Sequence, residues 1–84
     1  MKDVTIYSAD WCPFCQRAKK LFENKGVPFK EINVDQTPGL REEISAKTGF
    51  RTIPQIFIGD KFVGGFSDVS ALDNNGELDK LLKS

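Results

Sequence analysis

Apolar and polar positions alternate at the start of the chain and then change to a helical spacing. Val4–Tyr7 alternates and contains β-branched residues, which predicts a strand that ends near Ser8. From Pro13 onward, apolar residues recur at helical spacing, as on one face of an amphipathic helix. This helix is expected to end at Gly26, and its apolar stripe consists of Phe14, Ala18, Leu21 and Phe22.

The next segment of the chain repeats the order of strand and helix. Phe29–Val34 is predicted to be a second strand. Thr37 and Pro38 are typical of an N-cap and a first helical position, which predicts a second helix that carries Ile44 and stops at Gly49.

The last third of the chain predicts a hairpin and further helices. Gln55–Ile58 and Lys61–Val63 are short strands separated by two residues, which is typical of a β-hairpin. Ser67 or Asp68 is expected to cap a third helix that closes at 74–76, and the leucines beyond it predict a last short amphipathic turn. The order of elements predicts one α/β domain over residues 1–84, with a mixed sheet and helices on both faces.

Composition and charge exclude several functions. The 84 residues include 12 Lys and Arg and 12 Asp and Glu, whereas nucleic-acid binding needs a surplus of clustered basic residues, so no nucleic-acid partner is expected. No apolar stretch approaches the roughly 20 residues of a membrane span, and the charged opening residues do not form a signal-peptide core. We therefore expect a cytoplasmic protein without a membrane partner. It is expected to be monomeric, because one small core needs all the predicted apolar faces.

The candidate chemistry lies in two cysteines, in a sequence without histidine. Cys12 and Cys15 are found where the first strand has ended and the first helix begins, and Pro13 suits the first helical position, which makes Cys12 the N-cap. The Cys12 sulfur then faces unpaired N–H groups at the positive helix end, an arrangement that stabilises a thiolate. Cys15 is one turn further along and more shielded. This spacing predicts that Cys12 is the nucleophile and Cys15 the resolving thiol.

Two other interpretations of the cysteine pair stay open on the residues alone. Both side chains can serve as small buried hydrophobic groups. A metal site is the other interpretation, but two thiolates supply half of a tetrahedral site, so zinc or an iron–sulfur cluster would need a second chain or an outside thiol. No metal site is therefore expected.

Three motifs in one order carry a resemblance to a known family. They are C-P-F-C at residues 12–15, T-I-P at residues 52–54 and G-G-F-S-D at residues 64–68. Over its whole length the chain resembles a short bacterial dithiol glutaredoxin, a member of the thioredoxin-fold superfamily, with Phe14 in place of the usual Tyr. The resemblance implies a thioredoxin-like fold, with a four-stranded mixed sheet and about three main helices. It also implies glutathione-dependent thiol–disulfide exchange, with glutathione as co-substrate and no tightly bound cofactor.

The resemblance further implies where glutathione binds. Pro54 is cis in that family, and the backbone of Ile53 would pair with the cysteinyl unit of glutathione. Gly65 allows close approach of the backbone, and the helix that follows would hold the γ-glutamyl end. From the residues alone, Pro54 is equally an ordinary proline at the start of a strand. The implied glutathione-binding residues are Phe14, Arg41, Thr52, Ile53, Pro54, Gly65, Ser67 and Asp68.

Three further positions affect the choice of function. Arg41 aligns with the family position that contacts the glycine carboxylate of glutathione, although a lone arginine on a helix is usually solvated. Ala9 stands where many members have a Lys or Arg, so a cation near the thiolate is missing. Trp11 directly precedes the motif, as a tryptophan does in thioredoxin. In this chain Trp11 would shield the site or form a surface on which a partner docks.

Glutathione-dependent reduction of protein disulfides and glutathione mixed disulfides is the leading hypothesis. One alternative is a redoxin that a flavoprotein reductase reduces without glutathione; Ala9 and Trp11 favour it, and Arg41 and the G-G-F-S-D segment speak against it. The other is an iron–sulfur carrier in which two chains and two glutathiones bridge a cluster through Cys12. Pro13 and the absence of a C-G-F-S active site speak against that carrier.

Overall fold

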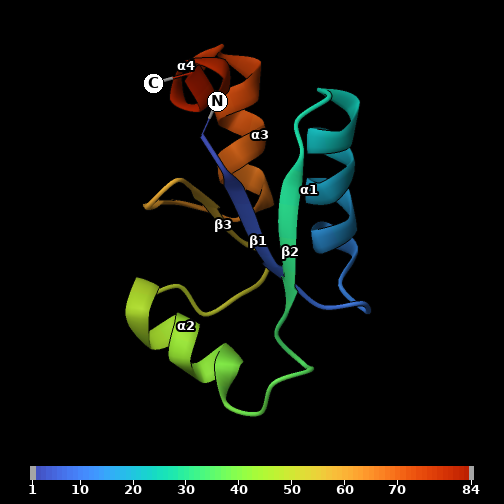
Figure 1. Ribbon diagram of the computed structural model, residues 1–84, viewed down its shortest axis with the longest axis vertical. Helices are drawn as coiled ribbons and strands as arrows, with labels where there is room; N and C mark the ends of the chain where they lie inside the picture. Colours follow the sequence, from blue (N-terminus) through green and yellow to red (C-terminus); the bar gives the residue numbers. More distant parts are fainter. Residues whose placement is uncertain (1, 84) are drawn as a thin grey trace.

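The computed structural model describes residues 2–83, which form four strands and four helices (Figure 1). The order of elements agrees with the prediction. In chain order they are β1 (Val4–Ser8), α1 (Pro13–Asn24), β2 (Phe29–Asn33), α2 (Leu40–Thr48), β3 (Gln55–Ile58), β4 (Lys61–Gly64), α3 (Phe66–Asn74) and α4 (Glu77–Lys83). No helix in the described part of the chain is long and apolar enough to cross a membrane.

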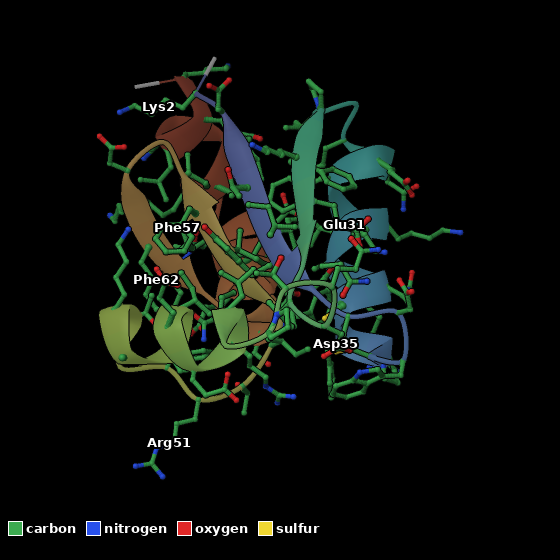
Figure 2. The ribbon with its side chains drawn as sticks, turned by 60° about the horizontal axis from the view of Figure 1, so that its bottom comes forward. Lys2, Glu31, Asp35, Arg51, Phe57 and Phe62 are labelled. Atoms are coloured by element: carbon green, nitrogen blue, oxygen red, sulfur yellow. The ribbon has the colours of Figure 1, made fainter. Side chains whose placement is uncertain are left out.

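The four strands form one mixed sheet in the order β2-β1-β3-β4. β1 is parallel to β2 and antiparallel to β3, and the β3–β4 pair is the predicted antiparallel hairpin. In Figure 2, α1 and α3 lie behind the sheet. α2 lies on the opposite face, near one end of the sheet. The predicted mixed sheet with helices on both faces is therefore confirmed.

The core is divided into two clusters, and the smaller one surrounds the cysteines. The larger cluster lies between the sheet and three of the helices, and it consists of Val4, Ile6, Ala18, Phe22, Val27, Ile56, Ile58, Val69, Leu78 and Leu82. The smaller cluster lies beyond the end of β1 and consists of Ala9, Cys12, Cys15, Val34 and Ile53. Both thiols are therefore held by packing as well as by the helix.

The start of α2 differs from the prediction. Its N-cap is Gly39, with a φ of 82°, and the helix begins at Leu40. Thr37 and Pro38 instead lie in a turn closed by the Leu40 N–H, which donates to the Thr37 carbonyl over 3.1 Å. The prediction that Thr37 caps this helix was wrong, because the chain uses Thr37 as a backbone acceptor in the preceding turn.

The start of α3 also differs from the prediction. The N-cap is Gly65 rather than Ser67 or Asp68. Asp68 lies three residues inside the helix, and its carboxylate accepts a hydrogen bond from the Gly65 N–H at 2.9 Å. A carboxylate at the third helical position accepts the N–H of the N-cap residue, as the glutamate of a capping box does. Asp68 is therefore a capping residue, but the prediction that Ser67 or Asp68 is the N-cap itself was wrong.

Candidate active site

The Cys12 sulfur lies at the N-terminus of α1. Cys12 is the N-cap in extended conformation, with φ −94° and ψ 111°, and the helix begins at Pro13 as predicted. Its Sγ accepts a hydrogen bond from the Cys15 N–H at 3.2 Å. On the other side, the Cys12 thiol points to the carbonyl oxygen of Ile53, with 3.7 Å between sulfur and oxygen. The helix end and the segment before β3 thus meet at this sulfur.

Cys15 differs from Cys12 in its surroundings, although both cysteines are in the free thiol form. Cys15 is completely buried, whereas Cys12 keeps 4% of its surface exposed. Burial, followed by the side-chain hydrogen bond with Cys12, raises the pKa of the Cys15 thiol to about 12. Cys15 is therefore protonated at neutral pH and has to lose its proton before it can attack a disulfide.

The segment that reaches Cys12 from the far side contains a cis peptide bond between Ile53 and Pro54. A buried side chain, Gln55, fixes this segment. Its Nε2 donates to the carbonyl oxygens of Phe50, at 2.7 Å, and Thr52, at 3.2 Å. Its Oε1 accepts from the Thr48 hydroxyl at 2.8 Å. Gln55 therefore links the end of α2 to the loop that carries Ile53.

A cavity of about 240 Å³ opens beside this segment. All of the predicted glutathione-binding residues except Arg41 line it. Two aromatic residues that the prediction missed, Phe50 and Phe66, complete its wall. The lining consists of Phe14, Phe50, Thr52, Ile53, Pro54, Gly65, Phe66, Ser67 and Asp68. The three motifs of the sequence thus come together around one hollow.

Phe14 contributes to this cavity because it does not join the core. It lies on the predicted apolar stripe of α1, yet 50% of its surface is exposed, while Ala18 and Phe22 on the same stripe are buried. In the first turn of α1, Phe14 packs against Phe66 of α3, with 6.3 Å between ring centroids. Phe50 and Phe66 were missed because apolar residues are usually core residues, although Phe50 lies two residues before the T-I-P motif and Phe66 lies within G-G-F-S-D.

Arg41 lies outside the cavity, against Trp11. The guanidinium carbon of Arg41 is 5.6 Å from the centroid of the Trp11 ring. Trp11 is 60% exposed, and its Nε1–H donates to a carboxylate oxygen of Asp35 at 2.7 Å. In Figure 2, Asp35 lies in the loop that follows β2, close to the start of α1. Arg41 is therefore brought next to the residue before Cys12 rather than into the hollow beyond it.

Ala9 belongs to the small core around the two cysteines. Its side chain is completely buried in the cluster with the two cysteines. Its carbonyl oxygen accepts the Cys12 N–H at 3.2 Å, which tightens the turn into α1. Among residues 2–83, no group of three or more His, Cys, Asp or Glu side chains is placed to hold a metal ion.

Comparisons with known proteins agree with this geometry. A model of the Glutaredoxin family matches residues 4–63. The chain is 50% identical over 84 residues to a glutaredoxin of Pseudomonas aeruginosa, with both chains covered completely. It is 47% identical over 83 residues to glutaredoxin 3 of Escherichia coli K12, with 99% of this chain and 100% of that protein covered.

Solved structures give the same result. The solution structure of a glutaredoxin from Brucella melitensis is 51% identical, with a TM-score of 0.88 over 99% of this chain and 90% of that one. The crystal structure of a buckwheat glutaredoxin–glutathione complex is 32% identical, with a TM-score of 0.92 over 98% of this chain and 77% of that one. The chain, with its thioredoxin-like fold and paired thiols, therefore belongs to the glutaredoxin family of thiol–disulfide oxidoreductases.

Proposed function

We propose that this chain is a glutathione-dependent oxidoreductase that reduces glutathione mixed disulfides and protein disulfides. The observation that carries the proposal is the position of Cys12, whose sulfur lies at the start of α1 and 3.7 Å from the Ile53 carbonyl oxygen. Ile53 also lines the cavity formed by the three motifs. A glutathionyl group in that cavity would bring its sulfur to Cys12.

The first half of the reaction uses Cys12 alone. The Cys12 thiolate attacks the glutathionyl sulfur of a mixed disulfide, a bond forms between the two sulfurs, and the substrate thiolate leaves and takes up a proton. A second glutathione thiolate then attacks the glutathionyl sulfur on Cys12. This step releases oxidised glutathione and restores the Cys12 thiolate, so two electrons pass from glutathione to the substrate.

Cys15 takes part when the substrate is a protein disulfide. The Cys12 thiolate attacks one sulfur of the substrate disulfide, and the other substrate sulfur leaves as a thiolate. Cys15 then attacks the Cys12 sulfur, which releases the first substrate sulfur as a thiolate and leaves a Cys12–Cys15 disulfide. Two glutathiones reduce this disulfide and leave as oxidised glutathione. The proton of Cys15 has to leave before Cys15 attacks Cys12, because burial holds its pKa at about 12. We infer that the intramolecular position of Cys15, one helical turn from Cys12, compensates for its low thiolate fraction.

The proposed position of glutathione follows from the cavity walls. The backbone of Ile53 would pair with the cysteinyl unit as an added strand does. The γ-glutamyl end would lie at the start of α3, where Gly65, Ser67 and Asp68 line the cavity. The buckwheat relative, whose structure is a complex with glutathione, supports this assignment through its likeness to the chain.

Arg41 is the proposed partner of the glycine carboxylate of glutathione. Its place against Trp11 supports this role, because Trp11 directly precedes Cys12 in the chain. We further propose that residues 1–84 form one glutaredoxin domain that acts as a monomer in the cytoplasm. The hydrogen bond from the Lys2 N–H to the Leu82 carbonyl oxygen, at 2.8 Å, supports one domain because it joins the two ends of the chain.

Turnover of a small glutathione mixed disulfide tests the proposed function. The rate is measured with glutathione, glutathione reductase and NADPH for the wild type, Cys12→Ser and Cys15→Ser. We expect Cys12→Ser to abolish turnover, because it removes the nucleophile, and Cys15→Ser to keep turnover of this substrate. With a protein disulfide as substrate, Cys15→Ser should be strongly impaired.

An inactive wild type would contradict glutathione dependence. If the same protein is then reduced by a flavoprotein thioredoxin reductase, the redoxin alternative replaces the proposal. If both serine variants are equally inactive with the small mixed disulfide, the division of roles between Cys12 and Cys15 is wrong.

A further inference from the structure

A second hollow lies on the outer face of α1, beside the start of α3. Its volume is about 450 Å³, and its lining combines an apolar floor with basic and amide side chains. Figure 1 shows α1 and α3 on the same side of the sheet, so both helices can contribute to it. The hollow is lined by Gln16, Arg17, Lys20, Leu21, Asn24 and Phe66.

This hollow adjoins the glutathione cavity at the aromatic rings of Phe14 and Phe66. Phe66 lines both of them. Phe14, which lines the cavity, packs on Phe66 and carries the Arg17 guanidinium over its ring, 5.2 Å from the centroid. The ring pair thus forms the boundary between the two spaces, and Arg17 spans it.

The charges of the hollow are unbalanced. Arg17 and Lys20 are both exposed, and within the described chain neither has a carboxylate at ion-pair distance. Other lysines of α1 and its C-cap are neutralised, since Lys19 pairs with Glu31 and Lys25 pairs with Asp73. The hollow therefore presents two free cations beside apolar carbon.

With glutathione in the first cavity, the polypeptide of a glutathionylated protein would extend from Cys12 beyond the rim of that cavity. The second hollow adjoins this rim at Phe66, so it is a surface that the polypeptide can reach. We propose that this hollow binds the polypeptide next to the reacting cysteine of protein substrates and selects segments with acidic residues beside apolar ones. This proposal rests on the proposed function, whose glutathione site it extends.

Two synthetic peptides test this selection. Each contains one glutathionylated cysteine, flanked on both sides by Glu and Leu in one peptide and by Lys and Leu in the other. At low ionic strength we expect kcat/KM of the wild type to favour the acidic peptide by about five-fold, which is the scale of two exposed ion pairs. The preference should decline in about 0.5 M salt, because exposed charges are screened.

Charge-reversal variants test whether Arg17 and Lys20 cause the preference for the acidic peptide. The double variant Arg17→Glu/Lys20→Glu should invert the preference between the two peptides. The matched control, Lys30→Glu/Lys61→Glu, makes the same change in net charge on the edge strands of the sheet and should keep the wild-type preference. The readout is the ratio of the two kcat/KM values, so a general change in turnover cancels.

Equal ratios in the wild type and in Arg17→Glu/Lys20→Glu would overturn the proposal, as would a wild type without preference. An NMR titration of the protein with the acidic peptide lacking cysteine separates binding from turnover. Shifts at the amides of Arg17, Lys20 and Phe66 together with an inactive wild type would overturn the proposed function and keep the docking surface. No shifts there, with an active wild type, would overturn the docking surface alone.

Discussion

The two thiols of one motif have unequal surroundings because the helix turns one of them into the core. Cys12 is at the helix end and accepts the Cys15 N–H, while Cys15 is completely buried. Desolvation disfavours a charged thiolate inside the protein, so burial is the largest cause that raises the pKa of Cys15 from 9.0 to about 12. The sequence predicts this order of exposure from spacing, but the size of the effect depends on the side chains packed around Cys15.

Alkylation of Cys15 tests this pKa. In the Cys12→Ser variant, we expect the rate of reaction with iodoacetamide to rise about ten-fold per pH unit between pH 7 and 10 without a plateau, because the thiolate fraction keeps growing below the pKa. The same variant unfolded in urea should reach a plateau above pH 9. Mass spectrometry follows the alkylation. A rate that reaches a plateau below pH 9 in the folded variant would show that burial does not hold the thiol protonated.

At the scale of elements, the junction of β4 and α3 depends on one glycine. Gly64 has a φ of +125°, a conformation that residues with a side chain rarely adopt. A Cβ added there would overlap the Asp68 carboxylate. This carboxylate accepts the Gly65 N–H at 2.9 Å, so the same atoms cap α3 and exclude a side chain at Gly64.

Substitution at this junction should therefore cost more than backbone strain alone. We expect Gly64→Ala to lower the free energy of unfolding by about 2–4 kcal/mol, since it combines a positive φ with a collision. The matched control is Gly76→Ala, where φ is +82° but an added Cβ meets nothing within 4 Å, and where about 1–2 kcal/mol is expected. Equal losses in urea denaturation would show that Asp68 moves aside at no cost.

Across the whole molecule, ion pairs connect the helices to the sheet and to each other. Lys19 of α1 pairs with Glu31 of β2 at 2.8 Å, and Figure 2 shows Glu31 between these two elements. Lys25, the C-cap of α1, pairs with Asp73 of α3 at 2.6 Å and with Asp79 of α4 at 3.0 Å. These partly exposed pairs contribute under about 1 kcal/mol each, so their main consequence is pH dependence.

The sign of that dependence follows from the direction of each pKa shift. The hydrogen bond from Lys19, and then that from Ser8, holds the pKa of Glu31 below its usual 4.5, so this stabilisation is present above pH 4.5 and is lost as the pH falls. Hydrogen bonds to Asp73 and then to Asp79 raise the pKa of Lys25 above 10.5, so its contribution is present below pH 10.5 and is lost at higher pH. The raised pKa of Cys15 acts in the same alkaline direction from pH 9.0 upward.

Thermal unfolding measured as a function of pH tests the expected loss of stability at both acid and alkaline pH. We expect Tm to stay nearly constant between about pH 5 and 9 and to fall on either side, because the protonation changes lie outside that window. Glu31→Gln should flatten the acid limb. Cys15→Ser should flatten the alkaline limb from pH 9.0 upward, and Lys25→Met only its part above pH 10.5. An acid limb of unchanged slope in Glu31→Gln would show that another carboxylate governs it.

Local patterns determined most of the elements and the position of Cys12 at the start of a helix. The alternation at Val4–Tyr7, the two-residue loop before Lys61 and the proline after Cys12 act through neighbouring residues, so the strand, the hairpin and the N-cap are all visible in the sequence. The starts of α2 and α3 were predicted at the wrong residues. The side chains of Thr37, Ser67 and Asp68 can each bind several nearby backbone groups, and the conformation of the folded chain decides which hydrogen bond forms.

The sequence by itself determined the order of strands and helices, the spacing of the two thiols and, through three motifs, the family. Only the tertiary structure decided that Phe14 leaves the core stripe, that Arg41 lies against Trp11, and that Phe50 and Phe66 join one cavity with the motifs. Periodicity and capping act over a few residues, whereas burial and cavity walls arise where segments distant in the chain pack together. For that reason the place of Cys12 at the start of a helix could be predicted from its neighbours, and the surfaces that surround it could not.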